Sequence, residues 1–532
     1  MEMIFGNELW MLIFYFCISV LFLILGWFLY SNFTRIHTPP GIIQGIKLRL
    51  IYFSICILEK LGVILEKLGI CSKLAVRRFL MDGVFPPGPC DLSIEETLFD
   101  TVPVRIYQSK TPSPEKRRGL VWIHGGGGIF GSFKSHERLC RFFAQESATV
   151  VVAIGIHTPP GIIQGIKLRL IYLFLRILEK LAVILEILGI CNEFAVRRFL
   201  IDGVFPPRPC DLSIKETLFD TVPVRIYQSK TPSPEKRRGL VWIHGGGGIF
   251  GSFKSHERLC RFFAQESATV VIAIGYPLAP EHPYPAQQRS CYMAISYFLK
   301  HAGDFGVDPQ RIVLGGDSIG GSFMVAASQQ LVLRQDLPQV RAHVLVYPFL
   351  QAVDFNLPSY QQNQRVPFLV KTDVGHFGKI YVTGNSSGVD ALMQNAHIPE
   401  KLRIKYQKWI SAEHIPEEFK GRGYVPFVPG RFSEALFKEY AAAFEARCSP
   451  LLMKDAVLRR FPETFLLTCE YDILRDDGLL YKKRLGDNGM SFTWHHLEDG
   501  FHGILSLVGF GPLEFPGTRR GLKTIIQFLE RY

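Results

Sequence analysis

The sequence lacks the paired cysteine and histidine patterns that hold a zinc ion or build a disulfide-rich fold. Its 532 residues contain eleven cysteines but no C-x-x-C pair. Zinc sites and disulfide scaffolds depend on close, regular spacings of that kind. Several of the cysteines lie in apolar runs that we expect to be buried. We therefore predict no metal, no cofactor and at most one or two disulfides.

Charged residues are also scarce, at 20% of the chain against 48% hydrophobic residues. This balance excludes an intrinsically disordered protein, because such chains have too little apolar surface to bury. The formal net charge is +12, but the basic residues form no stripe interleaved with aromatic ones. We predict no nucleic-acid partner. The excess positive charge suits an anionic membrane surface, or forms a solvated basic face.

One long uncharged run is present, at residues 9–30. A helix of roughly 20 apolar residues spans a bilayer. No cleavage site of small residues follows the run, so residues 1–35 are predicted to be an uncleaved membrane anchor. The flanking charges (Glu2 and Glu8 before; Arg35, Lys47 and Arg49 after) favour a cytosolic catalytic side. The N-glycosylation sequon at Asn385 favours the lumen.

A segment of 120 residues occurs twice. Residues 36–155 recur as residues 156–275 with 13 differences, and residues 96–151 match residues 216–271 without a change. Repeats that stack in a solenoid are shorter and diverge in sequence, so this is a recent tandem duplication. Each copy has a helical stretch (167–190 in the second copy) that is either an interfacial helix or a cap over the site.

The second copy leads directly into an alternating α/β pattern. Apolar strands are predicted at 215–219, 222–228, 239–243, 269–274, 311–314, 341–347, 464–469 and 491–496, with helices between most of them. Alternation of this kind predicts a mostly parallel sheet with helices on both faces. Residues around 350–450 lack the alternation and are predicted to form an inserted helical lid. The catalytic domain is therefore expected at 156–532.

Connection length favours the second copy as the part that joins this sheet. Only 74 residues separate His244 in the second copy from Ser318, and connections between adjacent elements are usually short. Residues 36–155 are then predicted to be an appended, non-catalytic lobe. Its strands would have no complete sheet to join, so we expect it to be poorly packed.

The segment Gly316-Asp317-Ser318-Ile319-Gly320 follows a strand and opens a helix. This is the pattern of a nucleophile elbow, in which glycines permit a sharp turn and a serine is exposed at its apex. A serine hydroxyl needs a histidine to take its proton. The chain offers Asp472 and His502, each after a strand and in the order Ser, Asp, His that this fold uses. We predict Ser318, Asp472 and His502 as the catalytic residues.

A second motif, His244-Gly245-Gly246-Gly247, follows the strand at 239–243. Ester hydrolysis passes through a tetrahedral oxyanion that backbone N–H groups must bind. Glycines let the backbone approach the substrate closely. We predict that the N–H groups of Gly245, Gly246 and Gly247, together with that of Ile319, form this oxyanion hole. Asp476 and Asp477 are interpreted as charges at a helix N-terminus.

Together these motifs resemble the arylacetamide deacetylase branch of the hormone-sensitive-lipase-like esterases. The resemblance rests on His244-Gly-Gly-Gly, Tyr276-Pro-Leu-Ala-Pro-Glu, Gly316-Asp-Ser-Ile-Gly, Tyr471-Asp-Ile-Leu-Arg-Asp-Asp-Gly and Asp499-Gly-Phe-His-Gly. It implies an α/β-hydrolase fold and a single-pass type II protein of the endoplasmic reticulum with a lumenal catalytic domain. It also implies hydrolysis of carboxylic esters, with arylamides or neutral lipid esters as further substrates.

The chain departs from that family in three ways. The duplication is foreign to it, the charges around the anchor fit the implied topology poorly, and Ile319 stands where a smaller residue is usual. The function predicted is therefore a membrane-anchored serine carboxylesterase that needs no cofactor. Two alternatives stay open at this point: a non-catalytic binding or scaffold protein on a hydrolase fold, and a chain that the duplication prevents from folding.

Overall fold

The structure, a computed structural model, describes residues 91–99, 102–111, 117–123, 137–146, 149–154, 193–202, 210–511 and 514–532, together with residues 183 and 186. The chain divides into two compact units, Met1–Ile171 and Tyr172–Tyr532. Within the described ranges no helix is long and apolar enough to cross a membrane. The predicted span at 9–30 and nearly all of the predicted helix at 167–190 lie outside those ranges.

The second unit is built on an eight-stranded sheet with the order β12-β11-β10-β9-β7-β8-β6-β5. Its strands are β5 (Leu212–Phe219), β6 (Val222–Ser229), β7 (Arg237–Ile243), β8 (Val270–Ile274), β9 (Val307–Asp317), β10 (Ala342–Val346), β11 (Glu463–Tyr471) and β12 (Phe492–Phe501). In this sheet order, every neighbouring pair between β12 and β8 is parallel. The remaining pairs, β8–β6 and β6–β5, are antiparallel. The sheet is therefore mostly parallel, as the alternating pattern predicted.

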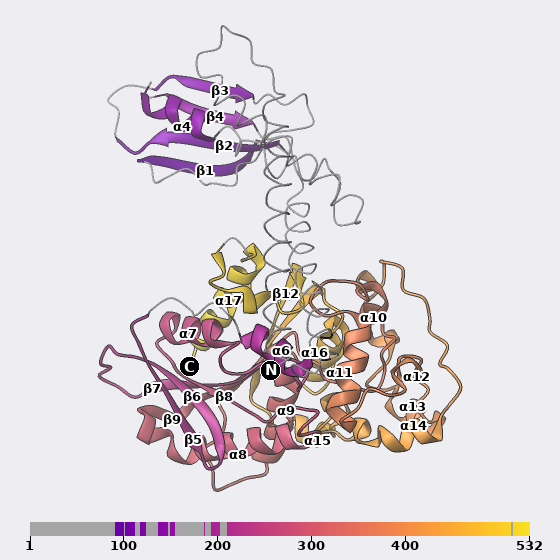
Figure 1. Ribbon diagram of the computed structural model, residues 1–532. Coiled ribbons are helices and arrows are strands. Elements are labelled where there is room, and N and C mark those ends of the chain that lie inside the picture. Colours follow the sequence, from indigo (N-terminus) through magenta and orange to yellow (C-terminus); the bar gives the residue numbers. More distant parts are fainter. Residues whose placement is uncertain are drawn as a thin grey trace, which may run out of the picture. The chain divides into compact units, whose positions relative to one another are not determined.

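Helices cover both faces of this sheet. Helices α7 (Glu257–Glu266) and α17 (Pro516–Leu529) lie on one face, and α8 (Ala286–His301) and α9 (Ile319–Leu331) lie on the other (Figure 1). Helix α16 (Arg475–Asp487) packs against β11. Strands β8 and β10 are buried along their whole length, which explains their continuous aliphatic runs, because a strand covered on both faces has no polar side.

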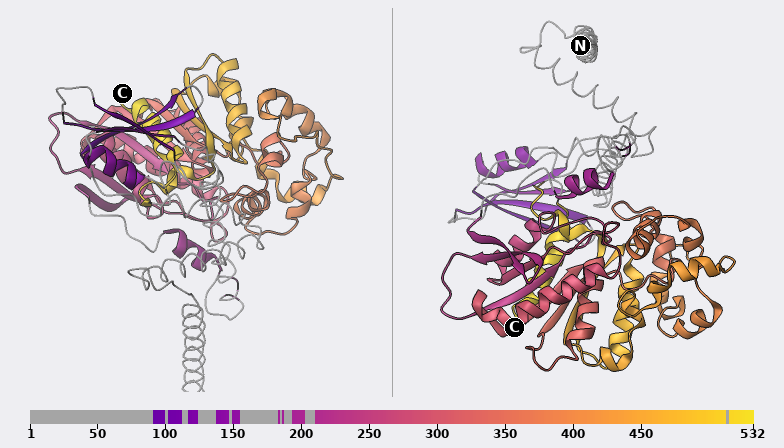
Figure 2. Two further views of the ribbon diagram at one scale, coloured as in Figure 1. Left: turned by 90° about the horizontal axis from the view of Figure 1, so that it is seen from above. Right: turned by 60° about the horizontal axis from the view of Figure 1, so that its bottom comes forward.

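The chain between β10 and β11 forms a helical insertion. It contains α10 (Pro358–Gln362), α11 (Lys371–Thr383), α12 (Val389–Met393), α13 (Glu400–Tyr406), α14 (Glu434–Glu439) and α15 (Asp455–Leu458). Figures 1 and 2 show these helices, in orange, gathered beside one end of the sheet. Their apolar side chains share one continuous core with the sheet. Inserted helices are thus present around 350–450, where they were predicted, and their role as a lid stays a prediction.

The first unit contains a smaller sheet with the order β1-β2-β4-β3. Its elements are β1 (Leu92–Phe99), β2 (Val102–Ser109), β3 (Gly119–Ile123), α4 (Glu137–Glu146) and β4 (Val150–Ile154). The register is that of the second copy: Val104 pairs with Ile154 just as Val224 pairs with Ile274. The second copy thus supplies β5 to β8 of the large sheet, and the first copy forms a four-stranded sheet of its own.

Candidate active site

Ser318 lies at a sharp turn between β9 and α9. Its backbone has φ 55° and ψ −125°, a conformation that costs energy for a residue with a side chain. The turn requires glycine at two positions. A Cβ atom at Gly316 would lie 2.6 Å from the Gly320 carbonyl oxygen, and one at Gly320 would overlap the Ile243 carbonyl oxygen. The predicted elbow is therefore formed, with glycine where the backbones touch.

The three predicted catalytic side chains lie in one hydrogen-bonded line. His502 Nε2 is 2.9 Å from Ser318 Oγ, and His502 Nδ1 is 2.9 Å from Asp472 Oδ2. Asp472 is completely buried. The Leu474 N–H donates to its Oδ1 at 2.8 Å, and the Asn363 side chain of the insertion donates to its backbone oxygen at 2.8 Å. These bonds fix the carboxylate that faces the histidine.

The glycine loop, residues 244–251, approaches the elbow in a backbone conformation that only glycine adopts easily. Gly246 and Gly247 have φ of +114° and +66°, and a Cβ atom at Gly246 would overlap the Phe250 carbonyl oxygen. In the part of the chain that the structure describes, the N–H groups of Gly246, Gly247 and Ile319 donate to no other group. These three donors are therefore free to bind an oxyanion.

Gly245 does not fit the role predicted for it. Its N–H donates to Asp317 Oδ1 at 3.1 Å, and a donor that is already engaged inside the protein is not available to substrate. The prediction of Gly245 as an oxyanion donor is therefore corrected: it is the residue by which the glycine loop is attached to the elbow.

Asp476 and Asp477 lie in the first turn of α16, as predicted, and both are also fully buried. Asp476 pairs with the buried guanidinium of Arg475 at 3.0 Å, and Asp477 accepts from the Leu350 N–H at 2.9 Å. Burial raises the pKa of Asp477 to about 7. Asp476 also accepts from the Ser359 N–H at 2.7 Å, so both carboxylates attach the insertion to α16, a role that periodicity alone does not reveal.

Aromatic side chains of the insertion cover the glycine loop. Phe377 of α11 lies against Gly247, and its ring meets that of Phe250 at a centroid distance of 5.4 Å. On another side, α6 (Glu193–Asp202) packs Phe194 against Phe250 at 6.2 Å. Arg198 of α6 donates to the backbone oxygen of Ile249 at 2.9 Å. Apolar side chains from α6 and α11 therefore pack against the glycine loop.

Metal ions need sets of donor side chains that converge on one point. In the described ranges, no group of three or more histidine, cysteine, aspartate or glutamate side chains could hold a metal ion. Six cysteines are described, and all are free thiols: Cys140, Cys210, Cys260, Cys291, Cys448 and Cys469.

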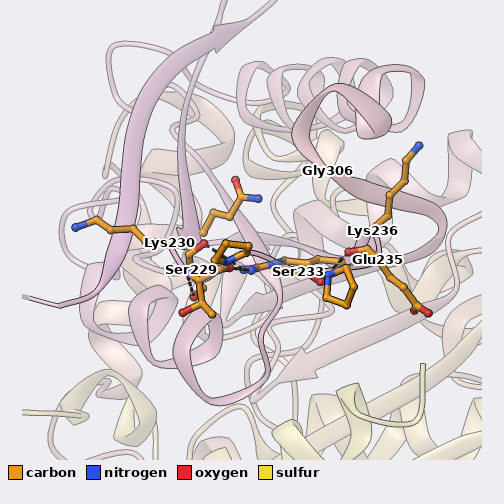
Figure 3. A pocket seen from close by; sticks show the side chains of 11 residues that line it. Ser229, Lys230, Ser233, Glu235, Lys236 and Gly306 are labelled. Carbon is orange, nitrogen blue, oxygen red and sulfur yellow. Dashed lines mark hydrogen bonds between the residues drawn. The ribbon is translucent and has the colours of Figure 1, made fainter.

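A cavity of about 440 Å³ lies at the loop between β6 and β7, apart from all of the predicted site residues. Figure 3 shows Lys230 and Lys236 pointing away from it in opposite directions. The guanidinium of Arg237 donates to the backbone oxygens of Ser229 and Thr231 and so closes the loop on itself. We assign no chemistry to this cavity, and the elbow remains the candidate active site.

Comparisons with known proteins agree with this fold. The family profile described as alpha/beta hydrolase fold matches residues 120–161, 240–400 and 422–506. The solved structure of carboxyl esterase 2 from the fungus Tuber melanosporum aligns with a TM-score of 0.48 and 20% identity over 62% of this chain and 89% of that chain. That likeness is too distant to support an argument.

The curated relatives are much closer in sequence. Arylacetamide deacetylase-like 3 of Mus musculus is 39% identical over 376 residues, which are 71% of this chain and 92% of the relative. Arylacetamide deacetylase of Bos taurus is 38% identical over 365 residues, which are 67% and 90% of the two chains. The protein is thus a carboxylic ester hydrolase of the α/β-hydrolase fold. It belongs to the arylacetamide deacetylase family, as its motifs predicted.

Proposed function

We propose that the protein is a serine carboxylesterase in which Ser318 attacks the substrate carbonyl. His502 takes the Ser318 proton as general base and later returns it to the leaving group as general acid. Asp472 orients the imidazole and stabilises its cation. The observation that carries this proposal is the continuous line of hydrogen bonds, 2.9 Å and 2.9 Å long, from the serine through the histidine to a buried carboxylate.

The tetrahedral intermediate would be stabilised by backbone donors. Attack by Ser318 puts a negative charge on the former carbonyl oxygen, and fixed N–H groups stabilise that charge without reorganising. The unengaged N–H groups of Gly246, Gly247 and Ile319 support this role. Loss of one such donor costs about 3–4 kcal/mol of transition-state stabilisation.

The substrates proposed are apolar carboxylic esters and arylamides. The name of the Bos taurus relative states that it deacetylates arylacetamides, and the aromatic cover of Phe194, Phe250 and Phe377 suits an aryl or acyl group. Ile319 is almost completely buried beside the nucleophile. It narrows the site relative to a small residue at this position, so we expect short acyl chains to be preferred among p-nitrophenyl esters.

A fluorophosphonate probe tests the proposed nucleophile. It should label the full chain at Ser318, and Ser318→Ala should abolish both labelling and ester hydrolysis. Ser322→Ala is the matched control: its hydroxyl lies four residues further along α9 and donates to the Phe349 backbone oxygen instead. Labelling that survives in folded Ser318→Ala protein would contradict the proposal.

We also propose that residues 9–30 anchor the protein in the endoplasmic reticulum membrane with the catalytic unit in the lumen. The exposed position of Asn385 supports glycosylation, because its side chain lies on the surface between α11 and α12. The Ser387 hydroxyl of the same sequon donates to Asn385 Oδ1 at 2.8 Å. An endoglycosidase should shift the electrophoretic mobility of the membrane-expressed parent protein but not that of Asn385→Gln. A parent protein whose mobility does not change on treatment would contradict the lumenal orientation.

A further inference from the structure

The peptide groups on both sides of Gly245 are held by buried side chains. The Gly245 N–H donates to Asp317 Oδ1 at 3.1 Å, and the Gly245 oxygen lies 2.8 Å from His244 Nδ1. Burial, and then the nearby charge of His256, lowers the pKa of His244 to about 3. The imidazole is therefore neutral, and its Nδ1–H is the group that donates to the Gly245 oxygen.

The backbone also fixes the glycine loop at the next residue, Gly246. The Gly246 oxygen accepts from the N–H groups of Ile249 at 3.1 Å and Phe250 at 2.8 Å. Both ends of the turn are thus fixed, at Gly245 by side chains and at Gly246 by backbone. Gly246 has a φ of +114°, and among the described residues its N–H and that of Gly247 take no part in the bonds that hold the loop. A change at Gly245 would move both of these donors.

Asp317 is itself held by a histidine from the start of α7. Its Oδ2 lies 3.2 Å from His256 Nε2, and His256 Nδ1 lies 2.9 Å from Ser255 Oγ. The Ser255 hydroxyl donates its one hydrogen to the Ser252 oxygen at 2.8 Å, so it accepts from Nδ1. A carboxylate only accepts, so Nε2 must donate as well. The Nε2–H of His256 is therefore the group that donates to Asp317.

The contact with His256 also affects the ionisation of Asp317. Burial by itself would raise the pKa of this carboxyl, but the interactions with His256, and to a smaller extent those with His244 and His502, lower it, and the pKa lies below its ordinary value. Asp317 and His256 are 3% and 8% exposed. Their hydrogen bonds go to Gly245, to Ser255 and to each other, not to Ser318 Oγ or His502, so both act through the glycine loop and neither is a catalytic residue.

We propose that Asp317 and His256 are positioning residues that set the oxyanion donors of the glycine loop relative to the nucleophile. Asp317 precedes Ser318 directly, so one carboxylate joins the nucleophile's own peptide to Gly245. His256 fixes that carboxylate from the other side. The inference rests on the proposed function and goes beyond it, because it assigns a role in transition-state binding to two residues outside the Ser318–His502–Asp472 line.

The repeat supplies a control of matched sequence. His136 is the counterpart of His256 in the first copy, and the residues around both histidines are identical. Four variants of the full chain test the proposal: Asp317→Ala, Asp317→Asn, His256→Ala and His136→Ala. For each, kcat and KM are measured with p-nitrophenyl butyrate, and the inhibition constant is measured with phenylboronic acid, which forms a tetrahedral adduct on the active serine.

We expect Asp317→Ala and His256→Ala to lower kcat by about 10²-fold, the scale of one lost oxyanion donor, with KM changed less than about threefold. Boronate affinity should fall in proportion to kcat/KM, because the same donors bind both tetrahedral species. Asp317→Asn keeps an oxygen for the Gly245 N–H and should recover activity to within about tenfold of the parent protein. His136→Ala should behave as the parent.

Loss of stability alone would give a different pattern. His343 is fully buried and bonded to Ser328 Oγ at 3.0 Å, away from the glycine loop, so His343→Ala should lower the melting temperature without weakening boronate binding. If Asp317→Ala fails to fold, His256→Gln, which keeps one donor, takes its place and should show an intermediate loss.

Three results would overturn the inference: unchanged kcat in Asp317→Ala, an equal loss in Asp317→Asn, or a fall in kcat without weaker boronate binding. The variant Ser318→Ala shows whether such a result contradicts the positioning role alone or the proposed function as well. If Ser318→Ala still hydrolyses the ester, the proposed function is wrong. If Ser318→Ala is inactive while Asp317→Ala equals the parent protein, only the positioning role is wrong.

Discussion

Strands β3 and β7 carry the same five residues, Gly-Leu-Val-Trp-Ile, but they are buried to different degrees. Val241 of β7 is 1% exposed, whereas its counterpart Val121 in β3 is 61% exposed. In the large sheet, β7 pairs with β8 on one side and β9 on the other. In the first unit β3 pairs with β4, and no second strand joins it among the residues that the structure describes.

Contacts within each copy are nevertheless the same. Arg105 bonds Glu137 at 2.7 Å, and Arg225 bonds Glu257 at 2.6 Å. The hairpins β1–β2 and β5–β6 have matching registers. Short-range pairing is therefore encoded in the repeated segment, but burial of its central strand depends on a strand that only the chain after the second copy provides. An edge strand with exposed apolar side chains favours aggregation; the poor packing expected of this lobe stays a prediction.

The largest difference between the copies should appear in catalysis. Gly246→Pro places a residue limited to negative φ at φ +114° and removes a donor N–H, so esterase turnover should fall by at least about 10²–10³-fold. Gly126→Pro changes the same motif in the first copy and should leave most turnover intact. Equal losses, or a loss from Gly126→Pro alone, would show that the first copy supplies the oxyanion loop.

A smaller difference is expected in stability. Trp242 is fully buried against Gly315 of β9, whereas Trp122 is only partly buried. Removing a large aromatic side chain from a packed core costs about 3–5 kcal/mol. Trp242→Ala should therefore lower the urea midpoint at which esterase activity is lost, and Trp122→Ala should leave that midpoint nearly unchanged. Equal midpoints for the two variants would mean that β9 does not create the difference in burial.

The smallest effect should be a pH dependence confined to the second unit. Asp477 has no counterpart in residues 36–155, and burial raises its pKa from 3.8 to about 7. Between about pH 4 and pH 7 the folded chain holds this proton more tightly than the unfolded chain, so its contribution to stability falls as the pH rises.

Asp477→Asn should flatten this part of the melting-temperature profile between pH 4 and pH 7. Asp390 is exposed, so Asp390→Asn is the control and should keep the parent protein's slope of melting temperature against pH. A slope that Asp477→Asn leaves unchanged would contradict the assignment of this proton to Asp477.

Much of the site was predictable because its residues follow local rules. The elbow needs glycine where backbones touch, and Asp472 and His502 follow strands whose carboxyl ends meet at one edge of the sheet. The role of Gly245 was not predictable, because its N–H is engaged by Asp317, 72 residues away in the chain. The burial of Asp476 and Asp477 was missed for a similar reason: the residues that cover them belong to the insertion.

The sequence by itself determined the elements of each copy, their registers and the order of Ser318, Asp472 and His502, because these depend on side-chain pattern and short-range pairing. Residues 96–151 and 216–271 are identical and cannot differ in propensity, so the difference between them was decided by tertiary structure. Pairing with β9 buries β7 and leads its glycine loop to the elbow, where Asp317 and His256 hold it. Such partners are distant in the chain, and only the folded sheet brings them within hydrogen-bonding distance.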